Sequence, residues 1–393
     1  MTTMDKKHTN NGKWLILIGS LLVITFISCG GGKSKNLPLP QEDSSKAPNQ
    51  SINWAKEADS GQLALKSEFW NEYQHYYNQS NLPNDGFNYW WQAHALDVLV
   101  DGYLRTNNQS YLAQIDVLLS GIKQKNGNTM HNTFYDDMEW MGLACLRAYK
   151  ATGNMQYKDS AVQLWGWIKE GWSEIKNGGI AWASGSPDAK NACSNAPAAI
   201  LAARLYELDN KQEDLQWAVK IYKWLKDYVV DPSSGLVWDA YGNTNPGNIY
   251  TYNQGTFIGA ALELYTITKE NGYLLDATRN ADYLVNDGTK FSPGGILKGE
   301  NTGDGGLFKG IFIRYLTNLT LSQAIDDKRQ KKYADFLEKN ATSLLTNATR
   351  RPNFIFGPDW VHQPGTFQSD CSVQLSGVML LEAVNQLSAS KIN

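Results

Sequence analysis

The residues with the clearest chemical potential are Asp136 and Asp137, which are neighbours in the segment 134–140, Phe-Tyr-Asp-Asp-Met-Glu-Trp. Cleavage of a glycosidic bond uses one carboxylic acid that protonates the leaving oxygen and one carboxylate that attacks the anomeric carbon or activates water. Consecutive residues leave a helix about 100° apart, so both carboxyls of a first turn can point into one opening. Ionisation of one carboxyl raises the pKa of the other, which separates such a pair into a nucleophile and a proton donor.

An Asp-Asp dipeptide can also be structural or bind calcium. Acidic residues in a first helical turn are stabilised by the helix dipole, whatever their function. For a calcium site the surroundings are unfavourable, since no spaced acidic series like an EF-hand loop flanks the pair. Whether the pair is catalytic or structural therefore has to be judged from the elements that position the two aspartates.

Those elements are predicted to be helices. From residue 51 onward apolar residues recur at three- and four-residue spacing, and strand signals are few and short. Segments rich in Ala, Gly and Leu alternate with segments that carry more Lys, Asp and Glu, which is typical of an inner and an outer ring of helices. The predicted inner segments are 91–104, 138–149, 198–208, 257–268, 311–321 and 373–387.

An internal repeat predicts the architecture. Polar positions at the start of successive inner segments recur at intervals of roughly 60 residues, at Asp136, Asn195, Asn253, Lys309 and Asp370. Six helical hairpins, the first starting with an outer helix near 52–77, would close into an all-α (α/α)6 barrel. The inner helices would then share one face for their amino ends, which offer unpaired N–H groups and a positive dipole end. Helix capping explains any one of these polar residues, but five at a matched register favour a ligand-binding face.

Further motifs follow the aspartate pair in a fixed order. They are Trp140, Leu143-Ala144, Tyr149 and Thr152-Gly153-Asn154, then Gly178-Gly179-Ile180-Ala181-Trp182, Asn191 and Asn195, then Tyr252-Asn253-Gln254-Gly255, and Phe308-Lys309-Gly310-Ile311-Phe312 with Arg314-Tyr315. In these residues, and in order from about Trp54 to Leu387, the chain resembles glycoside hydrolase family 76. The first and last hairpins match more loosely.

The resemblance implies an (α/α)6 barrel and an endo-acting α-1,6-mannanase or a related transglycosylase that retains the anomeric configuration. It also implies that Asp136 is the nucleophile and Asp137 the general acid/base, with a covalent mannosyl enzyme forming on Asp136. The substrate would be an α-mannan polysaccharide or oligosaccharide. No cofactor and no metal is implied.

Around the pair, polar and aromatic side chains are candidates for binding the sugar. Hydroxyls would bond to Asn195, Asn253, Gln254, Asp304 and Lys309, while apolar sugar faces would pack on Trp91, Trp140, Tyr252 and Trp360. A capped turn with a stacked tyrosine is the alternative for 252–255, and a buried ion pair with an acidic neighbour such as Asp304 is the alternative for Lys309 and Arg314. His94 is left out of the catalytic set, because a single histidine on an apolar helix face is more often a core residue.

The amino-terminal residues predict export. Lys6, Lys7 and Lys13 precede an apolar run that ends in Phe-Ile-Ser-Cys at 26–29, which resembles a bacterial lipobox with Cys29 as the lipid anchor. Residues 1–28 are then a lipoprotein signal peptide, 29–50 a flexible tether and 51–393 the catalytic domain. An ordinary signal peptide or a short anchor would export the protein as well. We expect a lipid-anchored monomer in a bacterial cell envelope.

Composition excludes several classes of function. The 36 Lys and Arg against 39 Asp and Glu give a net charge of -3 and form no basic stripe, so nucleic acid is not an expected partner. Beyond Cys29 only Cys145, Cys193 and Cys371 remain, without the spacing of a zinc site or a disulfide framework, and Cys145 is expected to be buried. No phosphate loop, HExxH motif or Ser-His-Asp arrangement is present.

Two rival functions fit the same barrel. One is a non-catalytic glycan-binding lipoprotein, against which the intact aspartate pair argues. The other is an unsaturated-uronide hydrolase or a lyase, which would need basic residues to receive uronic carboxylates. The segments near Asp136 and Asn253 supply few of these.

Overall fold

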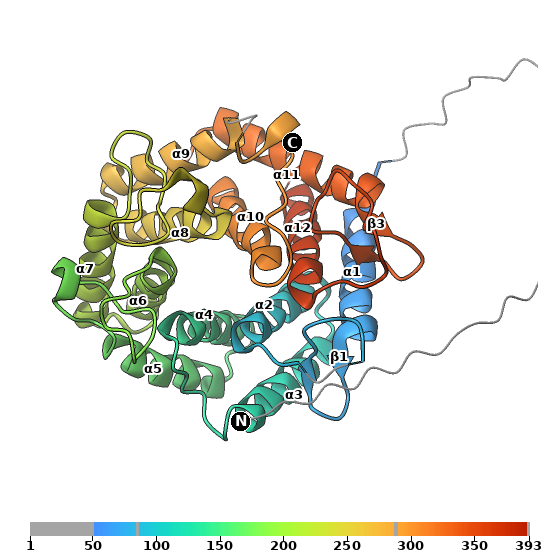
Figure 1. Cartoon of the computed structure of the whole chain (residues 1–393), viewed down its shortest axis with the longest axis horizontal. Coiled ribbons are helices and arrows are strands. Elements are labelled where there is room, and N and C mark those ends of the chain that lie inside the picture. Colours follow the sequence, from blue (N-terminus) through green and yellow to red (C-terminus); the bar gives the residue numbers. More distant parts are fainter. Residues whose placement is uncertain (1–50, 84–85, 287–289, 391–393) are drawn as a thin grey trace, which may run out of the picture. The chain divides into compact units, whose positions relative to one another are not determined.

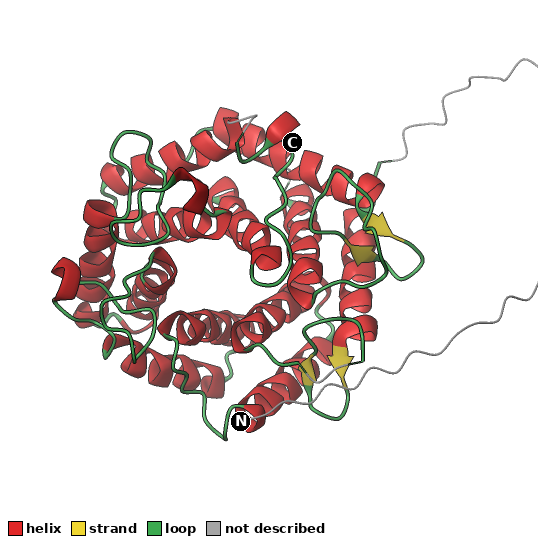
Figure 2. Ribbon diagram, viewed as in Figure 1, coloured by secondary structure: helices red, strands yellow, loops and turns green. Residues whose placement is uncertain are grey.

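The computed structural model describes residues 51–83, 86–286 and 290–390, and the predicted signal peptide and most of the tether lie outside them. Within these residues the chain forms twelve α-helices, four short 3₁₀ turns and two small hairpins of two strands each (Figures 1 and 2). The predicted all-α class is confirmed. None of the described helices combines the length and the hydropathy that crossing a membrane would require.

Six helices form an inner ring in which each contacts the next and α12 returns to α2 (Figure 1). This closure confirms the predicted (α/α)6 barrel, and the observed bounds contain or closely follow the predicted inner segments. The inner helices are α2 (Tyr89–Thr106), α4 (Tyr135–Thr152), α6 (Ala196–Asp209), α8 (Thr251–Thr268), α10 (Gly305–Leu321) and α12 (Cys371–Ala389).

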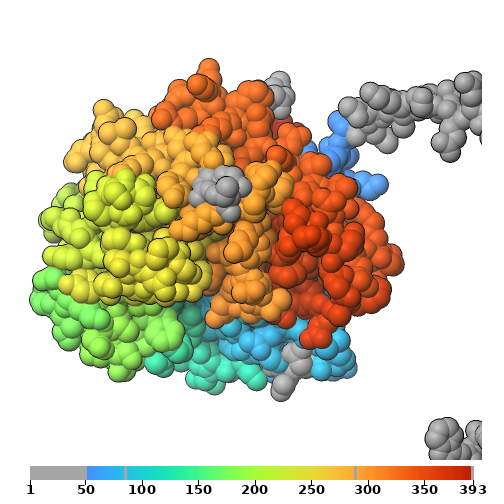
Figure 3. Space-filling view, turned by 45° about the horizontal axis from the view of Figure 1, so that its top comes forward, coloured from blue at the N-terminus to red at the C-terminus, as the bar shows by residue number. Residues whose placement is uncertain are grey.

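Six further helices surround this ring, each packed against an inner neighbour in the chain or, for α1, against α12. In the space-filling view the successive hairpins follow one another around the barrel in chain order (Figure 3). The outer helices are α1 (Trp54–Phe69), α3 (Gln109–Lys125), α5 (Met155–Lys169), α7 (Gln212–Tyr228), α9 (Asn271–Asn286) and α11 (Asp327–Asn347).

Composition explains which helices lie inside. Every residue from 251 to 262 in α8 is buried, whereas α7 buries one face only. Small residues let the inner helices approach closely, since a Cβ added to Gly255 would lie 2.6 Å from the Cα of Phe312 in α10. The alternation of apolar and charged segments in the sequence is therefore the alternation of inner and outer helices.

The first outer helix is shorter than predicted. It ends at Phe69 rather than near residue 77, and the chain continues into a hairpin of β1 (Trp70–Asn71) and β2 (Tyr76–Tyr77). His75 has a φ of 59° in the turn, and the backbone of Trp70 is already extended. The second hairpin, β3 (Thr349–Arg350) with β4 (Ile355–Phe356), holds the corresponding place before α12.

The outer and inner helices differ in how their amino ends are capped. Among the described helices, the N-cap residues of α1, α3, α5 and α11 each have a side chain that accepts a hydrogen bond from an N–H group of the first turn. None of the six inner helices has such a cap. Capping therefore does not explain the repeated polar residues at the inner helix starts.

Asn195, and carboxamides near the starts of other inner helices or on an outer helix, instead bind the backbone of a loop that precedes an inner helix. The carboxamide of Asn195 accepts a hydrogen bond from the N–H of Ile180 (2.8 Å) and donates one to its carbonyl (3.0 Å). Gln254 does the same to Val237, with distances of 2.8 and 2.7 Å. Equivalent pairs of bonds join Gln92 to Tyr77, Gln374 to 354–356, and Asn340 of α11 to 295–297. Buried loop backbone needs such partners, and the repeat supplies one for each of these loops.

Candidate active site

A cleft of about 360 Å³ opens at the amino ends of α2, α4, α8 and α10. Both aspartates of the pair line it, as do Trp140, Tyr252 and Asp304 among the predicted sugar-binding residues. The structure also adds residues that were not predicted as site residues. These are Asn88, Trp90, Phe134, Trp182, Asn191, Cys193 and Phe308.

The two aspartates occupy the first turn of α4, which begins after the extended residue Phe134. Asp136 accepts hydrogen bonds at both carboxyl oxygens, from the backbone N–H of Asp137 (3.0 Å) and from the indole Nε1 of Trp182 (3.1 Å). Asp137 accepts one from the side-chain amide of Asn132, at 3.1 Å. The carboxyl groups of Asp136 and Asp137 thus have different hydrogen-bond partners, although both line the same cleft.

These surroundings separate the two carboxyls in acidity. Burial raises the pKa of Asp136 to about 6, and hydrogen bonds from the Cys193 thiol, the Asp137 backbone and the Trp182 indole limit the rise. Burial also raises the pKa of Asp137 well above its usual range, and the negative charges of Asp136 and Asp304 raise it further. Asp137 is therefore the carboxyl that keeps its proton, and Asp136 is the one that ionises first.

Asp304 faces the pair from the start of α10. Its Oδ1 accepts hydrogen bonds from the indole Nε1 atoms of both Trp90 (3.1 Å) and Trp91 (3.0 Å). The prediction that Asp304 reaches the site agrees with this position in the cleft wall. Trp91 is buried and does not line the cleft, so it positions Asp304 instead of offering a ring to a sugar.

Aromatic rings surround the carboxylates. Tyr252 and Phe308 stack with their ring centroids 4.0 Å apart, and Phe134 packs on Trp182 at 4.7 Å. Trp182 and Phe134 remain more than a third exposed, which leaves their outer faces open. Such rings offer the flat apolar surfaces on which the C–H faces of sugars stack.

His94 lies below the cleft floor, buried between Trp90 and Trp140. Burial lowers its pKa to about 3, so the imidazole is neutral. It acts as the packed core residue that the sequence suggested.

Besides Trp91, five predicted sugar-binding residues do not line the cleft, and their predicted sugar contacts are corrected here. Asn195 and Gln254 are fully buried. Their carboxamides form hydrogen bonds with the loop backbone at Ile180 and Val237 and are not available to a sugar. Asn195 nevertheless matters to the site, since the loop that it holds carries Trp182.

Lys309 and Trp360 are two more of these residues. Trp360 is fully buried, and Lys309 places its Nζ 3.7 Å from the centre of the Trp360 ring while donating to the carbonyl of Pro358 (2.8 Å). Burial lowers the pKa of Lys309 to about 7. Arg314 forms the buried ion pair that was considered as the alternative, although its acidic partners are Asp97 and Asp101 and not Asp304.

Asn253 is also buried, with its side-chain amide donating to Asp239 (3.1 Å) beside Tyr252. Its carbonyl oxygen has no partner among the described residues. Asn253 therefore supports the Tyr252 wall from behind the cleft surface.

The missed residues carried partial signals. Trp182, Asn191 and Phe308 belong to motifs that mark the family resemblance, whereas Trp90 and Cys193 had no pattern of their own. Cys145, Cys193 and Cys371 are free and buried, as expected for Cys145. Within the described residues no group of three or more His, Cys, Asp or Glu is arranged to hold a metal ion.

Comparisons with known proteins agree on one family. Residues 53–391 match the model of glycosyl hydrolase family 76. The structure is similar to the GH76A α-1,6-mannanase of Salegentibacter sp. HEL1_6, with a TM-score of 0.82 and 47% identity over 85% of this chain and all of that one. It is equally similar to an inactive variant of that enzyme, with two aspartates changed to asparagine, in complex with α-1,6-mannotriose (46% identity, TM-score 0.82).

More distant relatives carry the same description. A mannan endo-1,6-α-mannosidase of Eremothecium gossypii is 25% identical over 276 residues, which are 62% of this chain and 60% of the relative. One from Saccharomyces cerevisiae is 25% identical over 58% of this chain and 57% of its own length. The chain thus spans somewhat more than half of these curated relatives. The family match over nearly the whole described domain leads to one conclusion: the chain belongs to glycosyl hydrolase family 76.

Proposed function

We propose that this protein is an endo-acting hydrolase of α-1,6-linked mannan that retains the anomeric configuration. The observation that carries the proposal is the pair of neighbouring carboxyls in one aromatic cleft, one of which ionises near neutral pH while the other keeps its proton. The similar Salegentibacter enzyme is an α-1,6-mannanase, and its variant with two adjacent aspartates replaced is inactive.

Each carboxyl has the environment that its step requires. Asp136, ionised and held by the Trp182 indole, attacks the anomeric carbon, and the bond to the leaving sugar breaks as Asp137 protonates its oxygen. The deprotonated Asp137 then takes a proton from water, and that water displaces Asp136 from the sugar. Two inversions give net retention.

The remaining walls of the cleft would hold the sugars. We infer that Trp90, Trp140, Trp182, Tyr252 and Phe308 present ring surfaces, and that Asp304 and Asn191 bond to hydroxyls. Among the described residues that line the cleft none is Lys or Arg. This favours a neutral sugar over the uronic acids of the rival hydrolase or lyase.

Hydrolysis of a linear α-1,6-mannan tests the function. The wild type should release oligosaccharides of mixed length at early times, as an endo-acting enzyme does, and Asp136→Asn should release none. Asp188→Asn is the matched control, because Asp188 is exposed and outside the cleft. If the wild type binds the mannan but releases no reducing sugar, the glycan-binding rival is correct.

We further propose that the enzyme works as a monomer attached to a bacterial envelope through a lipid on Cys29, a residue outside the described structure. The support is the sequence alone, and it is tested by labelling cells with a radioactive or clickable fatty acid. Label should enter the wild type and be lost in Cys29→Ala. Equal labelling of both proteins would contradict lipid attachment at Cys29.

A further inference from the structure

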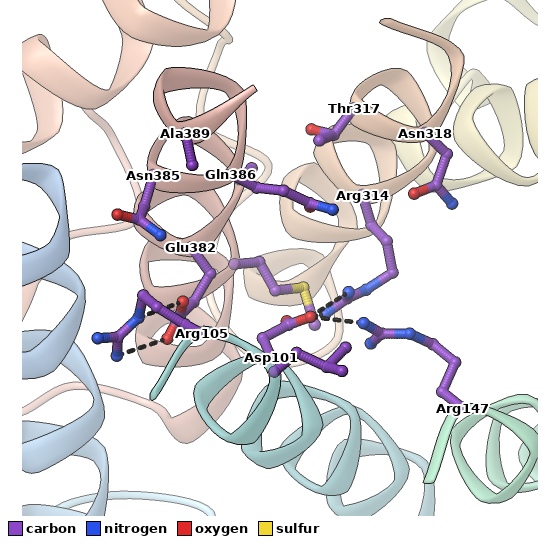
Figure 4. A pocket seen from close by; sticks show the side chains of 13 residues that line it. Asp101, Arg105, Arg147, Arg314, Thr317, Asn318, Glu382, Asn385, Gln386 and Ala389 are labelled. Atoms are coloured by element: carbon purple, nitrogen blue, oxygen red, sulfur yellow. Dashed lines mark hydrogen bonds and ion pairs between the residues drawn. The ribbon is translucent and has the colours of Figure 1, made fainter. Parts of the chain in front are cut away.

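A second cavity, of about 310 Å³, lies at the carboxyl ends of the inner helices, opposite the ends that form the cleft (Figure 4). Four inner helices build it, namely α2, α4, α10 and α12. It shares no residue with the cleft. The lining residues used below are Asp101, Arg105, Arg147, Arg314, Asn318, Glu382, Asn385 and Gln386.

The charges in this cavity are already compensated within the protein. Arg314 pairs with Asp97 (2.6 Å) and Asp101 (2.7 Å), and Arg147 pairs with the same two aspartates. Arg105 pairs with Glu382 at 2.8 Å. An ionic ligand would therefore find no unmatched opposite charge and would lose its own hydration on entry.

Unlike these charged groups, the carboxamides that line the cavity have no partner within the described part of the protein. Asn318 of α10 and Asn385 and Gln386 of α12 line the cavity. In Figure 4 Gln386 extends from α12 toward α10, whereas Asn385 lies on the side of α12 near Glu382 and Arg105. Gln386 is exposed and the other two are partly buried, and within the described structure the three side chains have no hydrogen-bond partner in the protein. Each carboxamide offers two donors and an acceptor, the combination that suits hydroxyl groups. Leu104, Met379 and Ala383 add apolar surface to the same cavity.

We propose that this cavity binds an uncharged sugar or polyol no larger than a disaccharide. Its volume lies at the lower end of the range for small-molecule sites, about 300 to 1,000 Å³. Its polar groups match hydroxyls, and its balanced ion pairs select against phosphate and carboxylate ligands. The site is independent of hydrolysis and does not rest on the proposed function.

The cavity and the cleft are separate sites. Between them lies a void of about 20 Å³, lined by His94, Trp140, Arg147 and Arg314 among others. A void of that size has room for about one water molecule and none for a sugar ring. Occupancy of the two sites can therefore be measured independently.

Crystals of the full described domain soaked in mannose or glycerol provide the test, together with calorimetric titration in solution. Mannose should appear in the cavity in contact with Asn385 and Gln386, in addition to any sugar in the cleft. The double variant Asn385→Ala/Gln386→Ala should weaken this second binding event roughly tenfold or more. Ser388→Ala is the matched control on the same helix, since Ser388 is exposed and does not line the cavity.

Two outcomes would overturn the proposal. The first is a cavity that holds only water in crystals whose cleft is saturated with sugar. The second is occupancy by inorganic phosphate or glucuronate in place of mannose and glycerol. A loss of mannan hydrolysis would bear on the cleft alone, and melting curves of the variants establish that each is folded.

Discussion

The aspartates at the start of α4 are one residue apart, yet their environments differ in the way that a double displacement requires. The carboxyl oxygens of Asp136 accept two hydrogen bonds. Asp137 accepts one, from the Asn132 amide, and it faces the negative charges of Asp136 and Asp304. Hydrogen-bond donors stabilise an anion, and neighbouring anions stabilise a proton. At the residue scale the roles therefore follow from the partners of each carboxyl.

The dependence of kcat/KM on pH tests these roles. Activity requires ionised Asp136, so the acidic limb should have its midpoint near pH 6. It also requires protonated Asp137, whose pKa is raised in part by Asp304. Asp304→Asn keeps an acceptor for both indoles but removes the charge, so the basic limb should move to lower pH. An unmoved basic limb would contradict the influence of Asp304 on the proton donor.

The burial of Asp137 should also make thermal stability depend on pH. Because the pKa of Asp137 is higher in the folded protein than its ordinary value of 3.8, its protonated form favours folding. This stabilisation is fully present below the ordinary pKa and is lost as the pH rises through the folded pKa. At alkaline pH Asp137→Asn should therefore melt about 2 °C or more above the wild type, and the difference should shrink toward pH 4. Asp188→Asn, at an exposed site, should melt like the wild type throughout.

At the scale of elements, the inner helices provide the first turn of the site and the loops before them provide its rim. Asn195 at the start of α6 connects the two, since it holds the backbone of Ile180 two residues before Trp182. Trp182 in turn donates to Asp136. A buried carboxamide outside the cleft is thus connected through Trp182 to the carboxyl group of Asp136.

A comparison of substitutions at Asn195 and Asn340 distinguishes an effect on the geometry of Asp136 from an effect on stability. Asn195→Ala leaves buried backbone groups of Ile180 unpaired, which should cost about 1 to 3 kcal/mol in the free energy of unfolding and lower kcat as Trp182 shifts. Asn340→Ala removes the same kind of paired hydrogen bonds from residues 295–297, none of which lines the cleft. It should destabilise the protein by a similar amount without changing kcat. Equal losses of kcat in both variants would reject the positioning role.

The sequence was sufficient to predict the helices and the position of the aspartate pair. Periodic apolar residues located the inner segments, and the first-turn position of Asp136 and Asp137 followed from their place before one of them. It was insufficient for the carboxamides, because a polar residue at a helix start has the same pattern whether it binds a ligand or a loop. Trp182 and Trp90 reach the cleft through loop and side-chain geometry that no periodicity encodes.

At the scale of the whole barrel, the two ends have different chemistry. One end carries the cleft, and the opposite end is closed by ion pairs among α2, α4 and α10, with Asp97 and Asp101 between Arg147 and Arg314. Removing one member leaves one buried charge uncompensated, which costs far more than losing an exposed pair. The network therefore ties neighbouring inner helices together.

Substitution of Arg314 tests this tie. Arg314→Met should lower the free energy of unfolding by about 3 to 5 kcal/mol, because Asp97 and Asp101 lose one of their two arginine partners and one buried negative charge is left uncompensated. Arg329→Met is the control, since Arg329 pairs with Asp282 and Asp326 at the surface and should cost about 0 to 1 kcal/mol. Urea unfolding of both variants measures the difference. Similar midpoints for the two would mean that the buried network adds no stability.

The most direct measurement of the proposed chemistry is the capture of the covalent intermediate. Asp137→Ala lacks the group that activates water, and an α-1,6-mannobiosyl fluoride needs no acid to release its leaving group. This variant should therefore accumulate one mannobiosyl unit, and peptide mass spectrometry should locate it on Asp136. Release of the fluoride without any adduct on the protein, or an adduct on a residue other than Asp136, would contradict the assignment of Asp136 as the nucleophile.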